Sequence, residues 1–109
     1  MIHVTIYKNH DQEYEGFDSI GHAGYAQAGE DIVCAGVSAL VLNTVNSIEA
    51  FTHDKYEVKT EEESGLVSFR FQEAASDAGR LLLKSLFLGL QGIQEFYGDE
   101  YISVLCKEV

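Results

Sequence analysis

Residues 21–40 read GHAGYAQAGEDIVCAGVSAL, and the pattern of the chain changes inside this stretch. Before it, apolar and polar residues alternate, as they do in a β-strand. From Val33 to about Phe51, apolar residues recur every three or four positions, as on one face of a helix. Asp31 stands where its carboxylate can accept the free amide hydrogens of the first helical turn. The stretch therefore predicts a glycine-containing loop over residues 21–31 that leads into a helix.

Alternating apolar residues predict two strands ahead of this loop, over residues 2–8 and 13–20. The polar residues between them supply a turn, so we expect the two strands to pair as a hairpin. In the second strand we expect Tyr14 on the same side as Ile20, with Phe17 on the opposite side.

Two further strands are predicted after the helix, in KYEVKT (55–60) and LVSFRF (66–71). The polar stretch EEESG joins them, and its Gly65 permits a tight bend. This second pair is also expected to form a hairpin.

Leucines at helical spacing predict a second helix that ends near Tyr97 and begins near Ser76, with Ser76 or Asp77 as its cap. Gly98 is suited to end it. The final stretch EYISVLCKE, residues 100–108, predicts a fifth strand.

The predicted order is strand-strand-helix-strand-strand-helix-strand, in a single domain over residues 1–109. Hairpins imply an antiparallel or mixed five-stranded sheet, and two amphipathic helices can cover one of its faces. We therefore expect an α+β fold, a two-layer sandwich. Its second sheet face must be polar or covered by a second subunit.

The chain is strongly acidic, with seven Lys and Arg against eighteen Asp and Glu and a formal net charge of −11. Such a charge repels nucleic acid and anionic membrane surfaces and attracts a basic partner. Acidity also serves solubility alone, so the charge does not identify that partner.

No run of about 18 uncharged apolar residues is present, so we expect no membrane span. The first ten residues lack the basic start and apolar block of a signal peptide. A cytoplasmic location is therefore expected, in which Cys34 and Cys106 stay reduced. The cysteines and histidines lack the spacing of metal ligands, so neither a disulfide scaffold nor a metal site is predicted.

Cys34 falls near the first turn of the predicted helix, where unpaired amides and the helix dipole favour a thiolate and lower its pKa. Asp31 opposes this effect if its carboxylate lies close, and His22 is the candidate cation that would offset it. The loop between His22 and Cys34 is long enough to bring imidazole and sulfur together. A Cys–His pair is the minimum for nucleophilic attack on an acyl carbon, and amides at the helix start could hold the oxyanion.

Each of these residues also has a structural explanation. Cysteine is among the most buried residue types, so Cys34 equally fits an inert position at a helix start. Asp31 either caps the helix or orients His22. Ser38, one turn after Cys34, is informative only if its side of the helix lines a cleft. Cys106 is expected to pack or to stay unreactive.

The block quoted above resembles the signature of the ribosomal-processing cysteine proteases, the Prp or YsxB-like family of bacteria. That signature is Gly-His, a short glycine-bearing loop, then Asp-Ile-Val-Cys and a Ser four residues further on. The matching positions here are Gly21, His22, Asp31, Ile32, Val33, Cys34 and Ser38.

The resemblance implies a cysteine endopeptidase with Cys34 as the nucleophile, His22 as its base, and Gly21, Asp31 and Ser38 beside the substrate. It implies that the substrate is a large-subunit ribosomal protein precursor, from which a short N-terminal extension is removed. It further implies a homodimer, a mobile loop between His and Cys, and no metal or organic cofactor. A basic ribosomal substrate suits the acidic charge of the chain.

Two other function classes remain open at this point. A non-catalytic module would bind the ribosomal protein without cutting it. A thiol redox sensor would oxidise Cys34 in preference to Cys106, although no resolving cysteine lies nearby in the sequence.

Overall fold

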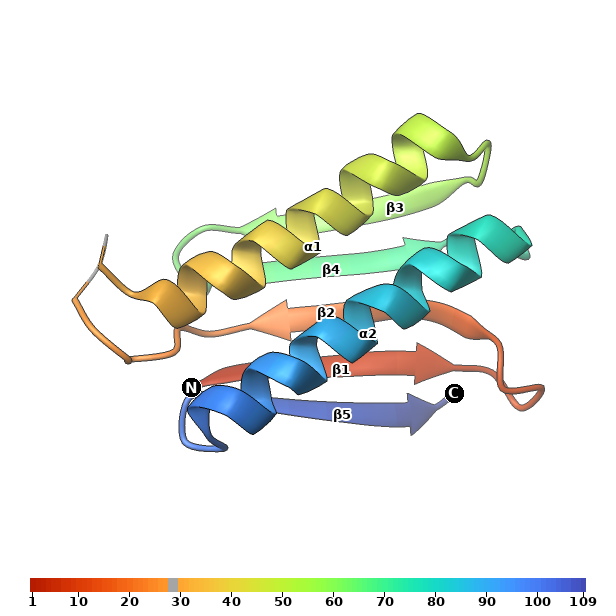
Figure 1. Cartoon of the computed structure of the whole chain (residues 1–109). Helices are drawn as coiled ribbons and strands as arrows, with labels where there is room; N and C mark the ends of the chain where they lie inside the picture. The colour runs from red at the N-terminus through yellow and green to blue at the C-terminus, as the bar shows by residue number, and fades with distance from the viewer. Residues whose placement is uncertain (28–29) are drawn as a thin grey trace.

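Two helices lie side by side across one face of a five-stranded sheet in the computed structural model, which describes residues 1–27 and 30–109 (Figure 1). The order of elements and the two-layer α+β architecture are as predicted. In chain order the elements are β1 (Ile2–Lys8), β2 (Tyr14–Ile20), α1 (Ile32–Phe51), β3 (Tyr56–Glu61), β4 (Leu66–Phe71), α2 (Asp77–Tyr97) and β5 (Ile102–Glu108).

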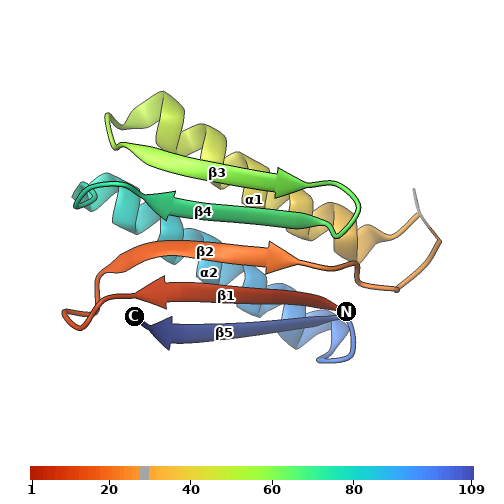
Figure 2. The ribbon, with the colours of Figure 1, turned by 180° about the vertical axis from the view of Figure 1, so that it is seen from behind.

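The sheet is mixed, with strand order β3-β4-β2-β1-β5. The two hairpins are antiparallel, and β2 pairs with β4 in the same manner. β5 returns beneath α2 to run parallel to β1, with Ile2 opposite Ile102. This order places the end of β2, the β3–β4 turn and the start of α1 at one end of the molecule (Figures 1 and 2).

The expectation that Tyr14 lies on the same side of β2 as Ile20 is wrong. The register between β1 and β2 shifts where Lys8 pairs with Tyr14 and Tyr7 pairs with Gly16, which leaves one extra residue in β2. Such a bulge reverses the alternation that follows it. Tyr14 and Phe17 are therefore both buried against the helices, whereas Ile20 is exposed.

The helices meet the sheet through regularly spaced apolar side chains. The side of α1 that faces the sheet carries Val33, Val37, Val41 and Ile48, all of which are buried. Thr44 lies on the same side, and its hydroxyl donates to the Leu40 carbonyl oxygen at 2.8 Å, so no buried polar group is unpaired there. The largest fully buried side chains come from both layers: Phe17, Phe69, Ile6, Ile48, Leu83, Leu86, Leu90 and Ile102.

α1 is also apolar enough to meet the usual length and composition test for a membrane-crossing helix, contrary to the expectation from uncharged runs. It has 20 residues, and its mean hydropathy is 1.5 over an 18-residue window. A helix that covers a sheet meets the same test, and α1 buries one side against strands. Its composition alone is therefore weak evidence for a membrane segment.

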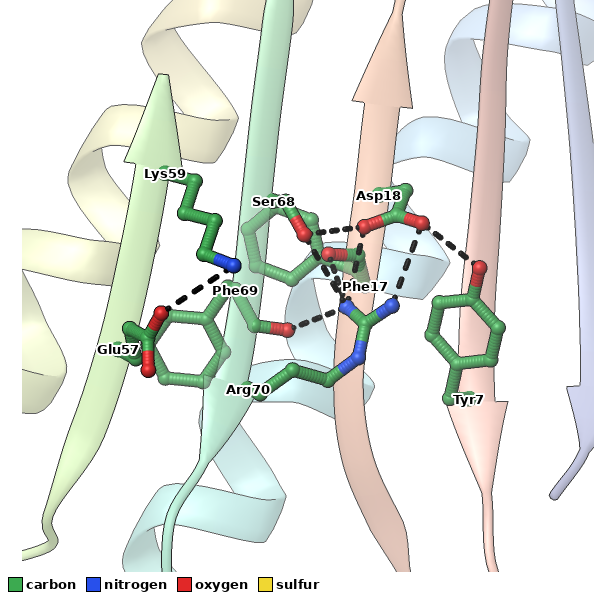
Figure 3. A network of polar contacts seen from close by, with 8 residues as sticks. All are labelled: Tyr7, Phe17, Asp18, Glu57, Lys59, Ser68, Phe69 and Arg70. Carbon is green, nitrogen blue, oxygen red and sulfur yellow. Dashed lines mark hydrogen bonds and ion pairs between the residues drawn. The ribbon is translucent and has the colours of Figure 1, made fainter.

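The sheet face away from the helices is polar, as expected, and is organised around one carboxylate (Figure 3). The Arg70 guanidinium donates to both oxygens of Asp18, at 3.0 and 3.2 Å, and to two main-chain carbonyls of β2 and β4. The hydroxyls of Tyr7 and Ser68 donate to the same carboxylate. Burial raises the pKa of Asp18, but the hydrogen bonds from Arg70, Ser68 and Tyr7 outweigh it and hold the pKa below its ordinary value.

Asp18→Asn is expected to lower the free energy of unfolding by about 1–2 kcal/mol at pH 7, because Arg70 loses its charged partner across β2 and β4. A depressed pKa means that this stabilisation is present above the ordinary pKa of a carboxyl group and is lost as pH falls through the folded-state pKa. Urea unfolding of the wild-type protein and of Asp18→Asn at several pH values measures this stabilisation. Lys59→Ala, which removes an exposed pair with Glu57, is the control and should cost little. If the difference in free energy of unfolding between the wild-type protein and Asp18→Asn stayed constant into the acid range, a lowered pKa of Asp18 would be contradicted.

Candidate active site

Asp31 fixes the start of α1 and ties the preceding loop to it. Its Oδ1 accepts the main-chain N–H groups of Val33 and Cys34, each at 3.0 Å. Its Oδ2 accepts the N–H of Tyr25 at 3.0 Å. Both carboxylate oxygens are thus bonded to main chain, which favours the capping role of Asp31 over the alternative of orienting His22. The same bonds occupy the helix-start amides that were expected to hold an oxyanion.

Cys34 is half-buried in the first turn of α1, and its Sγ accepts the N–H of Ala23 at 3.1 Å. Burial raises the pKa of the Cys34 thiol. The Ala23 amide lowers it and the negative charge of Asp31 raises it, and the net pKa lies above the ordinary value. The expectation of a lowered pKa at this helix start is therefore wrong for the unliganded protein. A raised pKa favours the protonated thiol of Cys34 over the thiolate at neutral pH.

His22 follows β2 and is exposed at the same end of the sheet. Its Nε2 lies 3.5 Å from the carbonyl oxygen of Glu63 in the β3–β4 turn. Within the described part of the chain, its ring makes no hydrogen bond to the sulfur of Cys34. Imidazole and thiol are thus neighbours across a shared hollow and are unbonded at rest.

Two adjoining pockets meet at these side chains, and His22, Cys34 and Ser38 line both. The first has a volume of about 160 Å³, includes Gly21 and has the apolar walls Ile2, Val37, Val41, Leu42 and Val67. The second has a volume of about 420 Å³ and is completed by Gly24, Ala26, Asp31 and Ala35. All five residues singled out from the sequence therefore border one continuous site, and Ser38 does face a cleft.

The loop between His22 and Cys34 is held at a second point by aromatic contacts. The Tyr25 ring lies edge-on to Tyr97, at the end of α2, and to Tyr101, just before β5. The centroid distances are 5.7 and 5.1 Å. Of the two glycines between His22 and Cys34, Gly24 lies in the described part of the loop and Gly29 lies outside the described residues.

Sequence reasoning missed the contribution of the β3–β4 turn to the site. Gly65 was expected only to permit a bend, yet it lines the apolar pocket and lies against His22. No local pattern could reveal this contact, because it depends on β4 pairing with β2. Over residues 1–27 and 30–109, no three side chains of the metal-ligating types come together.

The family model described as "Cysteine protease Prp" matches residues 1–103. The chain belongs to this family. The ribosomal processing cysteine protease Prp of Bacillus subtilis (strain 168) is 33% identical over a 103-residue alignment that covers 91% of this chain and 92% of that protein. The resemblance drawn from residues 21–40 is thereby confirmed, and the chain is a cysteine protease.

Solved structures of Prp share the fold over nearly the whole chain. The essential ribosomal processing protease Prp from S. aureus, in complex with a covalently linked product peptide, gives a TM-score of 0.92 at 32% identity. The same protease with a substrate peptide gives 0.87 at 31% identity. Each comparison covers 98% of this chain and 100% of the other. Within this Prp fold, Cys34 is the half-buried cysteine and Cys106 the exposed one.

Asp31→Asn is expected to speed alkylation of Cys34 at pH 7.5 several-fold, because removal of the carboxylate charge lowers the thiol pKa while Asn still caps the helix. In the wild-type protein the rate should keep rising above pH 8, as a raised pKa requires. Peptide mass spectrometry after timed iodoacetamide treatment measures both.

Glu30→Gln is the matched control, since it removes a neighbouring charge that does not touch the sulfur. It should leave the rate unchanged. A wild-type rate that already levels off below pH 7 would contradict the protonated resting state.

Proposed function

We propose that this chain is an endopeptidase that removes the N-terminal extension of a large-subunit ribosomal protein precursor. Cys34 is the nucleophile and His22 the general base and acid. The observation that carries the proposal is the meeting of His22 and Cys34 at two adjoining pockets, although the sequence separates them by a loop. The names of its Prp relatives, which are ribosomal processing proteases, support the substrate class.

The resting thiol must first lose its proton. A peptide in the site displaces water, which strengthens the electrostatic interaction between thiol and imidazole. His22 then accepts the proton from Cys34 Sγ, and the sulfur attacks the scissile carbonyl carbon. In this scheme the Cys–His ion pair forms with substrate and does not exist beforehand.

The tetrahedral intermediate needs a hydrogen-bond donor for its oxyanion. The amides of Val33 and Cys34 are bonded to Asp31, whereas the N–H of Ala23 is bonded to the attacking sulfur itself and so lies beside the carbonyl that the sulfur attacks. Ala23 is therefore the donor that we assign to the oxyanion. Collapse of the intermediate breaks the C–N bond, and His22 gives its proton to the leaving amine.

The thioester left on Cys34 is hydrolysed in the second half of the reaction. His22 takes a proton from water, the hydroxide equivalent attacks the acyl carbon, and the thiolate leaves and regains a proton. The crystallised S. aureus relative with a covalently linked product peptide supports chemistry of this type. No step requires a metal or organic cofactor.

The remaining site residues would contact the substrate. Ser38 and Gly21 border the apolar pocket, and Asp31 borders the other. The formal net charge of −11 would attract a basic ribosomal protein, with association faster at low salt. This acidic surface supports the substrate class, although it does not select one protein.

Cys34→Ala should reduce cleavage of an N-terminally extended large-subunit ribosomal protein by about 10³-fold or more, because no nucleophile remains. His22→Ala should reduce it by about 10²–10⁴-fold. Mass spectrometry of the new N-terminus measures cleavage, and the melting temperature verifies the fold.

Cys106→Ala is the matched cysteine control and should cut at the wild-type rate, since Cys106 lies on the exposed edge strand. If Cys34→Ala cleaved the precursor normally, the proposed nucleophile would be wrong. If the wild-type protein held the precursor intact in a stable complex, binding without cleavage would replace the proposal.

A homodimer and a cytoplasmic location complete the proposal. Exposed apolar side chains along α2 support self-association: Leu81, Leu88 and Phe96 are 64%, 72% and 82% exposed. Burial of such side chains favours assembly. Sedimentation equilibrium at micromolar concentration should give twice the chain mass of 12.1 kDa. A single-chain mass at every concentration would contradict it.

A further inference from the structure

The β3–β4 turn forms one wall of the site directly beside the candidate base. The pairing of β2 with β4 ends at Ser19 and Val67, so the turn that precedes β4 continues alongside the residues that follow β2. There the Gly21 N–H donates to the Ser64 carbonyl oxygen at 2.9 Å. The main chain just before His22 is thus fixed to the turn.

Gly65 lies where a side chain would not fit. Its φ is +70°, in the left-handed region that L residues rarely adopt. A Cβ at this position would stand 2.7 Å from the Gly21 carbonyl oxygen and 3.2 Å from Cε1 of His22. The first of these neighbours is main chain, which cannot rotate away. The absence of a side chain at Gly65 therefore sets how closely the imidazole packs on the turn.

The Glu63 carbonyl lies nearest one of the two imidazole nitrogens of His22, Nε2. A carbonyl oxygen only accepts hydrogen bonds, so its contact with Nε2, at the long distance of 3.5 Å, is favourable only when Nε2 carries the proton. In the neutral ring Nδ1 then holds the lone pair, which is the state needed to accept a proton. Asp31 does not compete for this role, because its two oxygens accept main-chain amides.

We propose that the β3–β4 turn positions the candidate base: the Glu63 carbonyl sets the tautomer of His22, and Gly65 lets the ring approach that carbonyl. This inference rests on the proposed function, in which His22 moves the proton of Cys34. The turn would thus supply through main chain the orienting group that other cysteine and serine proteases take from an Asn or Asp side chain.

Three variants separate positioning from stability. Gly65→Ala adds the Cβ and strains the backbone, while Gly65→Asn adds the Cβ with less strain because Asn tolerates positive φ. Gly98→Ala is the matched control: Gly98 also has positive φ, +110°, but nothing lies within 4 Å of its added Cβ.

Melting temperature, kcat and KM for the precursor, and imidazole ¹⁵N shifts of His22 at pH 8 are measured on each variant. The His22 signals are assigned by their loss in His22→Gln.

The wild-type protein should show the tautomer with the proton on Nε2. Both Gly65 variants should alter the tautomer signals and lower kcat by about 10- to 100-fold, with KM nearly unchanged. Gly98→Ala should melt at a lower temperature yet keep the wild-type tautomer and kcat. Gly65→Asn should regain stability over Gly65→Ala without regaining kcat.

A proton on Nδ1 in the wild-type protein would overturn the inference, and so would Gly65 variants with unchanged His22 signals and kcat. If the wild-type protein fails to cut any precursor, the proposed function fails, but the ¹⁵N signals still decide whether the turn holds His22.

Discussion

The carboxylate of Asp31 organises the site, and its two oxygens do different work. One holds the first turn of α1, which carries Cys34, and the other holds the loop that returns from β2 through Tyr25. A short acidic side chain suits this task because it reaches several main-chain amides at a helix start. The same charge stands close enough to the sulfur to disfavour its ionisation. The carboxylate that holds the helix start and the loop in place therefore also makes the resting thiol of Cys34 less reactive.

The sheet positions the second residue of the candidate pair, His22. His22 follows β2, and the turn before β4 lies beside it because those two strands pair. Figure 1 shows β2 in the sheet and α1 in the layer of helices packed on it. His22, which follows β2, and Cys34, in α1, therefore come from different layers. Their separation depends on how α1 packs through Val33, Val37 and Val41. A change in how α1 packs on the sheet would for this reason also change the separation of His22 and Cys34.

The sequence predicted the elements closely because their signals are local. Apolar spacing of two and of three to four residues marked the strands and helices, and Asp31, Ser76 and Gly98 marked helix ends as the structure has them. The block around Cys34 also identified the family. The bulge opposite Tyr7 was missed, although Gly16, an isolated glycine inside the strand pattern, is a signal for one.

The electrostatic state of the site also escaped prediction. The helix start alone argued for a lowered thiol pKa, but the net direction depends on burial and on the distance to Asp31, which only the fold determines. The contact of Gly65 with His22 is hidden for a similar reason, since it joins residues 43 positions apart (65 − 22). Strand order and side-chain neighbours are long-range properties that periodicity does not encode.

A sulfur that keeps its proton between encounters with substrate is also a poor target for peroxide, because the thiolate is the form that becomes sulfenic acid. Partial burial and the neighbouring Asp31 carboxylate, which raise the pKa of Cys34, therefore also disfavour its oxidation. In the mechanism proposed above, each catalytic cycle would then have to generate the Cys34 anion anew. The two features that disfavour oxidation of the sulfur would thus also slow the first step of the proposed reaction.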